Sequence, residues 1–141
     1  MKRVSVALST MALTVTTLFA LAPAVQAAPA ASCYASSCHH KNPTSTGCAN
    51  DAYTAKSARA SDGTLVELRY SPTCRAAWAR ISNTHVGAEA FVQNTAGQSD
   101  SVNVSSGSDV HTSMVNDANL QARACYATNS ASNFSACTGW Y

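Results

Sequence analysis

The clearest pattern in the chain is a strict alternation of apolar and polar side chains over residues 64–71. Val66 and Leu68 occupy one set of alternate positions, and Glu67 and Arg69 occupy the other. Successive side chains of a β-strand point to opposite faces of its sheet. The segment therefore predicts a strand with one buried face and one solvated face.

Weaker alternation predicts further short strands, and clusters of Gly, Ser, Asn, Asp and Pro predict the turns between them. The further strands are expected at 51–59, 74–81, 86–93, 101–105, 110–115, 120–127 and 136–141. Within one of them, Cys74, Trp78 and Ile81 also fit helical spacing, but that segment is short for a helix, so a strand is favoured. The last two predicted strands would form a closing hairpin.

Many short strands at regular spacing predict an all-β fold, as a small antiparallel barrel or sandwich. Residues 32–50 are rich in Ser, Asn, Gly, Pro and Cys, and they predict an irregular Cys-rich loop before the first strand. The sequence contains no internal repeat and no linker between domains. We therefore expect a single disulfide-stapled β domain.

The N-terminus has the pattern of an export signal. Lys2 and Arg3 precede an apolar run over residues 4–21, and small residues follow it, which predicts a removed signal peptide at 1–27. A membrane anchor is less favoured, because Ser and Thr dilute the run and no basic residues follow it. Lipidation of Cys33 is also less favoured, because the residues before it lack the usual branched apolar side chain.

Charge narrows the classes of partner. The chain has 141 residues with a formal charge of +2, and removal of the first 27 leaves 114 residues with seven basic and seven acidic side chains. A neutral domain without a basic face is a poor match for nucleic acid or for an anionic membrane surface. Residues 28–141 also contain no second run long enough to span a bilayer. We expect a secreted, extracellular monomer that contacts neither nucleic acid nor membrane.

All six cysteines lie in the predicted mature part, and an even number in an exported chain implies disulfides. They are Cys33, Cys38, Cys48, Cys74, Cys125 and Cys137. Spacing favours the pairs Cys125–Cys137, Cys33–Cys38 and Cys48–Cys74. Cys33–Cys48 with Cys38–Cys74 is a serious rival. Each bridge is expected to stabilise the fold by about 2–4 kcal/mol.

A zinc site is the competing interpretation of the N-terminal cysteines. Cys33, Cys38, His39, His40 and Cys48 could be drawn as a cluster, but their spacing does not match a regular paired-knuckle pattern. An exported chain also favours disulfides over zinc. We therefore expect no metal and no cofactor.

Catalytic motifs give little support for an enzyme. The sequence lacks a Gly-x-Ser-x-Gly elbow, a His-Glu-x-x-His motif, a Walker loop and a dinucleotide fingerprint. His85 or His111 could join Asp109 and a serine in a triad, but such loose sets arise by chance in most chains. Asp109 and His111 are more simply solvated polar residues beside a turn. We expect a non-catalytic protein.

Four residues on two neighbouring predicted strands form a candidate binding face. Arg69, Arg75, Trp78 and Arg80 could bind an anionic or sugar ligand through guanidinium hydrogen bonds and aromatic stacking. The structural alternative places Trp78 in the core and leaves the arginines to solvate the sheet, and for Trp78 this alternative is favoured.

Two further aromatic residues end the chain. Trp140 and Tyr141 are expected to pack the final strand onto the core, held by the nearby Cys137. The alternative is an exposed aromatic patch for a polymer ligand.

A resemblance to a known family lies in two segments, GCANDAYT at 47–54 and VELRYSPTCRAAWARI at 66–81. They resemble the YjfA-like family, domain of unknown function 2690, which is found in exported proteins of actinomycetes and some other Gram-positive bacteria. The resemblance covers about residues 32–95. It implies export and a compact Cys-bridged domain, but no activity, so no catalytic residue carries over.

Together these features favour a non-catalytic extracellular binding or interaction module at or near the cell envelope. Its ligand would be a cell-wall polymer or a protein. The alternative is a secreted inhibitor of a protease or other hydrolase. The turn at 71–74 or the loop at 33–48 could then supply a disulfide-braced inhibitory segment.

Overall fold

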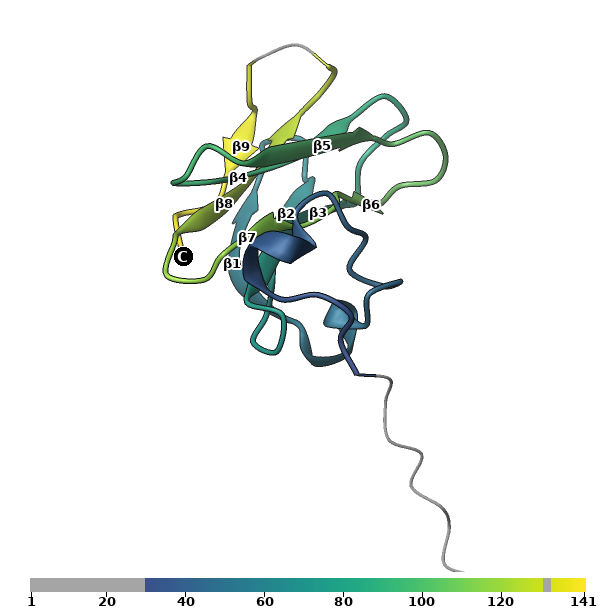
Figure 1. The fold of residues 1–141 in the computed structure, drawn as a ribbon. Coiled ribbons are helices and arrows are strands. Elements are labelled where there is room, and N and C mark those ends of the chain that lie inside the picture. The colour runs from purple at the N-terminus through teal and green to yellow at the C-terminus, as the bar shows by residue number, and fades with distance from the viewer. Residues whose placement is uncertain (1–29, 131–132) are drawn as a thin grey trace, which may run out of the picture.

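The computed structural model describes residues 30–130 and 133–141, which form two antiparallel β-sheets packed face to face (Figure 1). The predicted signal peptide at 1–27 lies outside the described residues. In chain order the elements are η1 (Ala35–Cys38), η2 (Cys48–Asp51), β1 (Tyr53–Arg59), β2 (Leu65–Ser71), β3 (Ala76–Ser82), β4 (Glu89–Asn94), β5 (Ser99–Asn103), β6 (Val110–His111), β7 (Val115–Asn116), β8 (Ala122–Ala127) and β9 (Ala136–Cys137). Both η elements are single 3₁₀ turns, and no helix in the described ranges is long and apolar enough to cross a membrane.

The chain crosses between the two sheets more than once, so each sheet combines strands from separate parts of the sequence. The first sheet has the order β1-β2-β3, and β6 and β7 pair with successive parts of the free edge of β3. The second sheet has the order β5-β4-β8-β9. Each named strand pairing is antiparallel, and the sheets do not close into a barrel. The all-β prediction is confirmed, and of its two forms the sandwich is the one observed.

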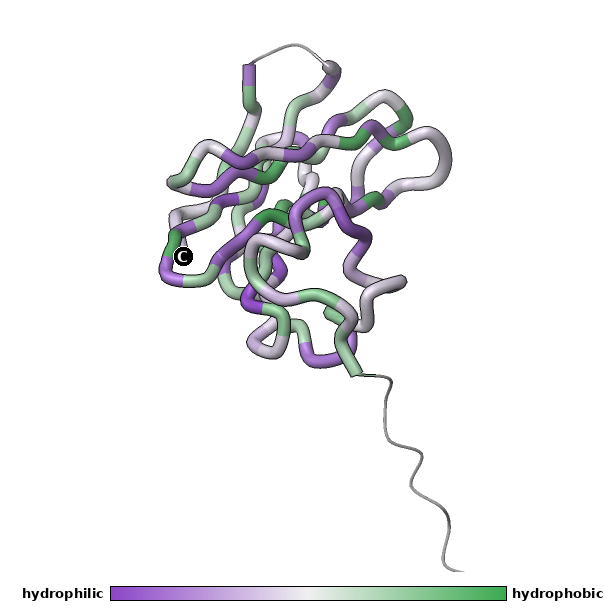
Figure 2. Tube along the Cα trace, viewed as in Figure 1, coloured by the Kyte–Doolittle hydropathy of each residue, from purple (hydrophilic) through white to green (hydrophobic). Residues whose placement is uncertain are grey.

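The main core lies between the sheets, where alternate residues of each strand point inward. Its buried members are Ala60, Val66, Leu68, Ala77, Ala79, Ile81, Ala88, Ala90, Val92, Val104, Val115, Ala122, Ala124 and Tyr126. The colours along the strands alternate between hydrophobic and hydrophilic residues accordingly (Figure 2). Small alanines fill much of the interface between the sheets, and Tyr126 is the largest fully buried side chain. Its hydroxyl donates a hydrogen bond of 2.6 Å to Asp62 in the β1–β2 turn.

The strand predictions hold best where alternation is strict. Val66 and Leu68 of β2 are fully buried, as the pattern at 64–71 predicts. The ambiguous segment 74–81 forms β3 from Ala76 onward, and the two residues before it belong to the turn. Alternation extended the next prediction too far, because Val86 is exposed in the loop before β4.

The predicted strand at 110–115 is interrupted in the middle. Thr112 lies between β6 and β7, where its backbone N–H donates to the carbonyl of Ala79 at 2.9 Å. The amide of Ala79 in turn donates to the Thr112 hydroxyl at 3.1 Å. The Thr112 hydroxyl thus takes the place of a backbone carbonyl as the acceptor for the buried Ala79 amide. This keeps that amide hydrogen-bonded where the edge strand is interrupted.

The N-terminal segment, residues 30–52, packs on the outer face of the first sheet (Figure 1). Ala76 and Trp78 point outward from β3 and form a second core cluster with Met114 and the cysteines of this segment. Backbone hydrogen bonds of 3.0 Å join His40 and Lys41 to Met114. The Cys-rich loop expected before the first strand is therefore a cover for one sheet face.

Candidate functional site

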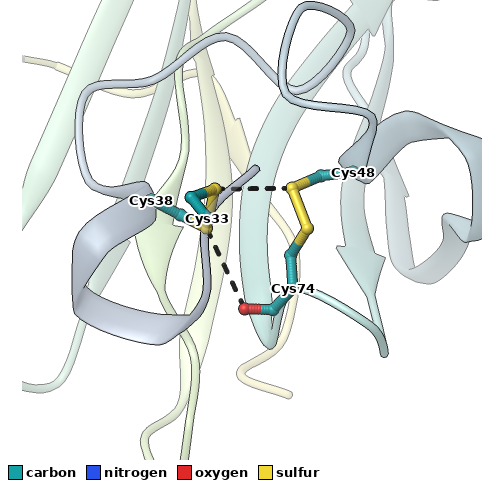
Figure 3. Close-up of side chains that lie close together, drawn as sticks. All are labelled: Cys33, Cys38, Cys48 and Cys74. Carbon is teal, nitrogen blue, oxygen red and sulfur yellow. Dashed lines mark hydrogen bonds between the residues drawn. A yellow bond between two sulfur atoms is a disulfide. The ribbon is translucent and has the colours of Figure 1, made fainter. Parts of the chain in front are cut away.

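Four cysteine sulfurs converge where the N-terminal segment meets the first sheet (Figure 3). The structure forms the favoured disulfides Cys33–Cys38 and Cys48–Cys74. The sulfurs of Cys33 and Cys48 are 3.6 Å apart, and all four sulfurs lie within 4.8 Å of one another. We call these four residues the sulfur cluster.

The two histidines considered as zinc ligands, His39 and His40, are not part of the sulfur cluster. Among the described residues, the group with metal-ligand spacing consists of four cysteines and includes neither His39 nor His40. The two imidazoles stack with ring centroids 3.7 Å apart. His40 Nδ1 lies 2.8 Å from the Asp100 carboxylate, which ties the N-terminal segment to β5 of the second sheet. The contacts that these histidines make join the segment to the sandwich.

Asp51 braces the turn that carries Cys74. Its carboxylate accepts a hydrogen bond of 2.6 Å from the Ser71 hydroxyl and one of 2.8 Å from the Thr73 amide. Loss of some hydration acts to raise the pKa of the exposed Asp51 carboxyl, but the hydrogen bonds from Ser71 and Thr73 outweigh it and leave the pKa lowered. The ionised carboxylate therefore holds η2 against the β2–β3 turn, beside the Cys48–Cys74 disulfide.

Two of the four predicted binding residues lie in a polar network on the first sheet. Arg69 donates to the Thr54 hydroxyl at 2.7 Å, and Thr54 donates to Glu67 at 2.7 Å. Arg80 lies 3.4 Å from the other Glu67 oxygen and 3.7 Å from Asp109. Because the guanidinium groups already have partners in the chain, a ligand at this face would have to compete with them.

The other two predicted binding residues contribute no side chain to that network, although Trp78 lies directly opposite Arg69 in the β2–β3 pairing. Trp78 is buried in the second core cluster, the structural position that was favoured for it. Arg75 occupies the β2–β3 turn with a positive φ of 47°, and its guanidinium donates to Asn119 at 2.9 Å. The structure therefore places Arg69, Trp78 and Arg80 on the outer face of the first sheet, where the N-terminal segment covers Trp78, and leaves Arg75 apart from them in the turn.

Arg75 belongs instead to a surface formed by tyrosines from four segments. Its guanidinium contacts the side chains of Tyr34 and Tyr70, and these contacts raise its pKa. Tyr53, Tyr70 and Tyr141 pack edge to face, with ring centroids 5.4–6.4 Å apart. The hydroxyls of Tyr53 and Tyr141 are hydrogen-bonded to each other. We call these five residues the tyrosine-rich end.

A buried carboxyl group lies beside the tyrosine-rich end. Asp117 is 5% exposed, and its Oδ1 has no hydrogen-bond partner. Burial raises the pKa of Asp117 to about 7, and the positive charge of Arg75 opposes part of that rise. The negative charge of Asp117 also contributes to a raised pKa of Tyr141, for which the hydrogen bond with Tyr53 is the largest cause. This end of the sandwich is thus sensitive to protonation near neutral pH.

The last two residues end at the surface and not in the core. Tyr141 pairs its backbone with Ala122 in β8 at 3.0 and 3.1 Å, which leaves its ring among the tyrosines. The Trp140 ring lies 4.8 Å from the Arg123 guanidinium. Both aromatic side chains remain more than a third exposed. Packing on the core was the favoured expectation for these residues, and the exposed alternative describes them better.

The residues considered for catalysis have separate partners. Asp109 interacts with Arg80, whereas His111 Nδ1 lies 3.0 Å from the carbonyl oxygen of Thr112. His85 Nε2 lies 3.1 Å from the carbonyl oxygen of Thr128, at a different place in the fold. These contacts are structural ones and give the loose triad no geometric support.

The sequence did not predict the tyrosine-rich end as a site. It singled out two of its members, Tyr141 as part of a possible aromatic patch and Arg75 as a candidate binding residue. Its members come from the N-terminal segment, β1, β2, the β2–β3 turn and the C-terminus. A hairpin around the turn at 61–63 brings Tyr53 near Tyr70, but their direct pairing depends on a β-bulge between Thr54 and Lys56. The contributions of Tyr34 and Tyr141 depend on chain crossings that the pattern of hydrophobicity does not encode.

The fold and these contacts define a small disulfide-bonded β-sandwich with one covered sheet face and an exposed tyrosine-rich end. A family model described as a protein of unknown function (DUF2690) matches residues 36–125. This match spans well over half of the chain, so the protein belongs to that family. The resemblance of 47–54 and 66–81 to domain of unknown function 2690 is confirmed, and the matched region extends into β8. No curated protein and no solved structure matches the chain.

Proposed function

We propose that the protein is a non-catalytic binding module that acts outside the cell, at or near the cell envelope. The observation that carries this proposal is the tyrosine-rich end. Tyr34, Tyr53 and Tyr141 are 55%, 42% and 39% exposed. Arg75 contacts Tyr34 and Tyr70, and the Tyr70 ring packs against the rings of Tyr53 and Tyr141. Tyrosine and arginine are enriched among residues that dominate binding energy, since both offer a broad apolar surface with hydrogen-bonding groups.

Rigidity supports the same proposal. The Tyr53, Tyr70 and Tyr141 rings brace one another, and Tyr141 is tied by its backbone to β8. A binding surface that is already ordered loses little conformational entropy when a ligand arrives. An extracellular site of action is supported by three disulfides and by the predicted signal peptide at 1–27.

Binding to cell-wall fractions tests the proposal. Purified oxidised protein is incubated with insoluble cell-wall polymer, and bound and free protein are separated by centrifugation. Replacing Tyr34 and Arg75 with alanine is expected to weaken binding at least about tenfold, as for residues near the centre of a binding site. Phe134→Ala is the matched control, because Phe134 is an exposed aromatic residue that packs on Phe91 away from the tyrosines. Equal binding by both variants would contradict the assignment of this surface.

Inhibition of a secreted hydrolase is a second candidate, favoured by one observation. Pro72 and Thr73 are exposed directly beside the buried, disulfide-bonded Cys74, which makes the turn rigid. Protease inhibitors commonly present such a braced segment and bury a standard-sized interface. The test is incubation with a panel of secreted proteases. Cleavage of the protein at this turn, without lasting inhibition of any protease, would remove the candidate.

A further inference from the structure

We propose that the sulfur cluster becomes a closed metal site when its two disulfides are reduced. It would hold one thiophilic divalent ion, such as Zn²⁺, through Cys33, Cys38, Cys48 and Cys74. This inference does not rest on the proposed binding function, since its observations are the positions of the four sulfurs; Tyr34 and Arg75 of the tyrosine-rich end directly follow Cys33 and Cys74 in the chain.

The distances between the sulfurs suit a tetrahedral ion. Zinc–thiolate bonds are about 2.3 Å long, which places the four sulfurs of a tetrahedral site about 3.8 Å apart. In the oxidised protein the two bridges already approach to 3.6 Å between Cys33 and Cys48, and all four sulfurs lie within 4.8 Å. After reduction, the two sulfurs of each former disulfide must separate to about 3.8 Å, which needs each sulfur to move on the order of 1 Å. Rotation of the cysteine side chains supplies such displacements without moving the strands.

Burial makes the cluster a closed structural site. Cys38, Cys48 and Cys74 are fully buried, and Cys33 is 8% exposed. Four protein sulfurs complete the coordination of zinc and leave no open position for a substrate. In the reduced protein without metal, these thiols would lose the covalent links between the segment and the sheet. A bound ion restores that link, so metal binding and ordering of the segment are coupled.

The chemistry balances with a phosphine as the reductant. Each disulfide takes up two electrons and two protons and becomes two thiols, while one phosphine is oxidised to a phosphine oxide with oxygen from water. The four thiols then release four protons as they bind one divalent ion, which gives a tetrathiolate complex with a net charge of −2. Because proton release accompanies binding, the affinity for the ion is expected to rise with pH.

The third disulfide provides an internal control. Cys125 and Cys137 face each other across β8 and β9, on the outer side of the second sheet, and form a separate pair. Neither residue belongs to the group of four sulfurs. Two thiols alone form a much weaker site than four, so reduction creates a strong site only at the sulfur cluster.

Thiol alkylation measured by mass spectrometry tests the proposal. The purified protein is fully reduced with a phosphine under anaerobic conditions and alkylated with and without an equimolar amount of Zn²⁺. We expect Zn²⁺ to slow alkylation of the four cluster cysteines at least about tenfold, while Cys125 and Cys137 react at an unchanged rate. Equal alkylation of all six cysteines in the presence of Zn²⁺ overturns the proposal. Protection that includes Cys125 and Cys137 overturns it as well.

Tryptophan fluorescence gives a second readout that does not depend on alkylation. Trp78 packs against the sulfur cluster, and Trp140→Phe leaves it as the single tryptophan of residues 28–141. We expect its emission to shift to longer wavelength on reduction and to return on addition of one equivalent of Zn²⁺. In this background the Cys125→Ser, Cys137→Ser variant should keep the response, and the Cys38→Ser, Cys74→Ser variant should lose it. A response that survives in the second variant would contradict the assignment of ligands.

Discussion

Asp117 is a residue whose protonation is expected to affect stability. Its carboxyl is buried beside Arg75 and Tyr141, and burial raises its pKa to about 7. The unfolded chain binds this proton only below about pH 4, because the ordinary pKa of aspartate is near 3.9. Between these values the folded state holds the proton more tightly than the unfolded state. The contribution of Asp117 to stability is therefore favourable at low pH and is lost as the pH rises toward and past 7.

The Asp117→Asn variant should remove this pH dependence. We expect its free energy of unfolding to exceed that of the unaltered protein above pH 7 by up to about 4 kcal/mol, since one pKa unit corresponds to about 1.4 kcal/mol. The difference should disappear near pH 4. Urea unfolding at a series of pH values measures it. Asp109→Asn, at an exposed carboxylate, is the control for the chemical change alone. Parallel pH profiles for Asp117→Asn and the unaltered protein would contradict the prediction.

Asp51 acts in the opposite direction. The hydrogen bonds from Ser71 and Thr73 lower its pKa in the folded protein, so its contribution to stability is present at neutral pH and is lost as the pH falls through the lowered value. We expect Asp51→Ala to cost about 1 kcal/mol at pH 7, the usual net contribution of a hydrogen bond, because Asp51 and Thr73 are exposed and water can replace the carboxylate. The cost should shrink in acid. Asn50→Ala, at the exposed neighbour, is the matched control, and an equal cost in both variants would show that the carboxylate plays no special part.

At the scale of elements, strict alternation of apolar and polar residues correctly predicted which side chains of a strand face the core. The hairpin of β2 and β3 has its inward residues where the pattern placed them, because a slip of one residue would turn Val66 and Leu68 to the outside. The path of residues 110–115 was not predictable in the same way, because a Thr112 side chain replaces part of the backbone ladder. Strand ends were also uncertain, since exposed Val86 continues an apolar pattern outside its sheet.

The short strand β9 depends on its disulfide. Its ladder with β8 has two residue pairs, one of which is the disulfide-bonded pair Cys125 and Cys137, and backbone hydrogen bonds from Ser135, Thr138 and Tyr141 to β8 flank it. We expect the Cys125→Ser, Cys137→Ser variant to lose about 3 kcal/mol of stability, because the bridge no longer restricts the unfolded chain. Hydrogen exchange should show that protection falls first at 136–141, while β2 and β3 keep theirs. Loss of protection in β2 and β3 to the same extent would contradict this local role.

At the scale of the whole molecule, the two sheets differ in how their outer faces are covered. The N-terminal segment 30–52 lies on the first sheet, and the outer face of the second sheet carries Phe91, Phe134, Arg123 and Trp140. Sequence reasoning gave the class of fold through local alternation, and spacing favoured the observed disulfide pairs while leaving one rival pairing open. It did not give the tyrosine-rich end, because that surface depends on how remote segments meet after the chain has crossed between the sheets.

The balance of charge over the molecule leads to the last prediction. Residues 28–141 carry seven basic and seven acidic side chains, so no net charge steers a charged ligand toward the domain. Binding at the tyrosine-rich end should then rest on ring contacts and short hydrogen bonds, with Arg75 as its one charged member. We expect a tenfold increase in salt concentration to change affinity for cell-wall polymer by less than about threefold. Ligands held by many charge contacts lose several orders of magnitude under a comparable change. A steep salt dependence that is abolished in Arg69→Ala, Arg80→Ala would instead place binding on the polar network of the first sheet.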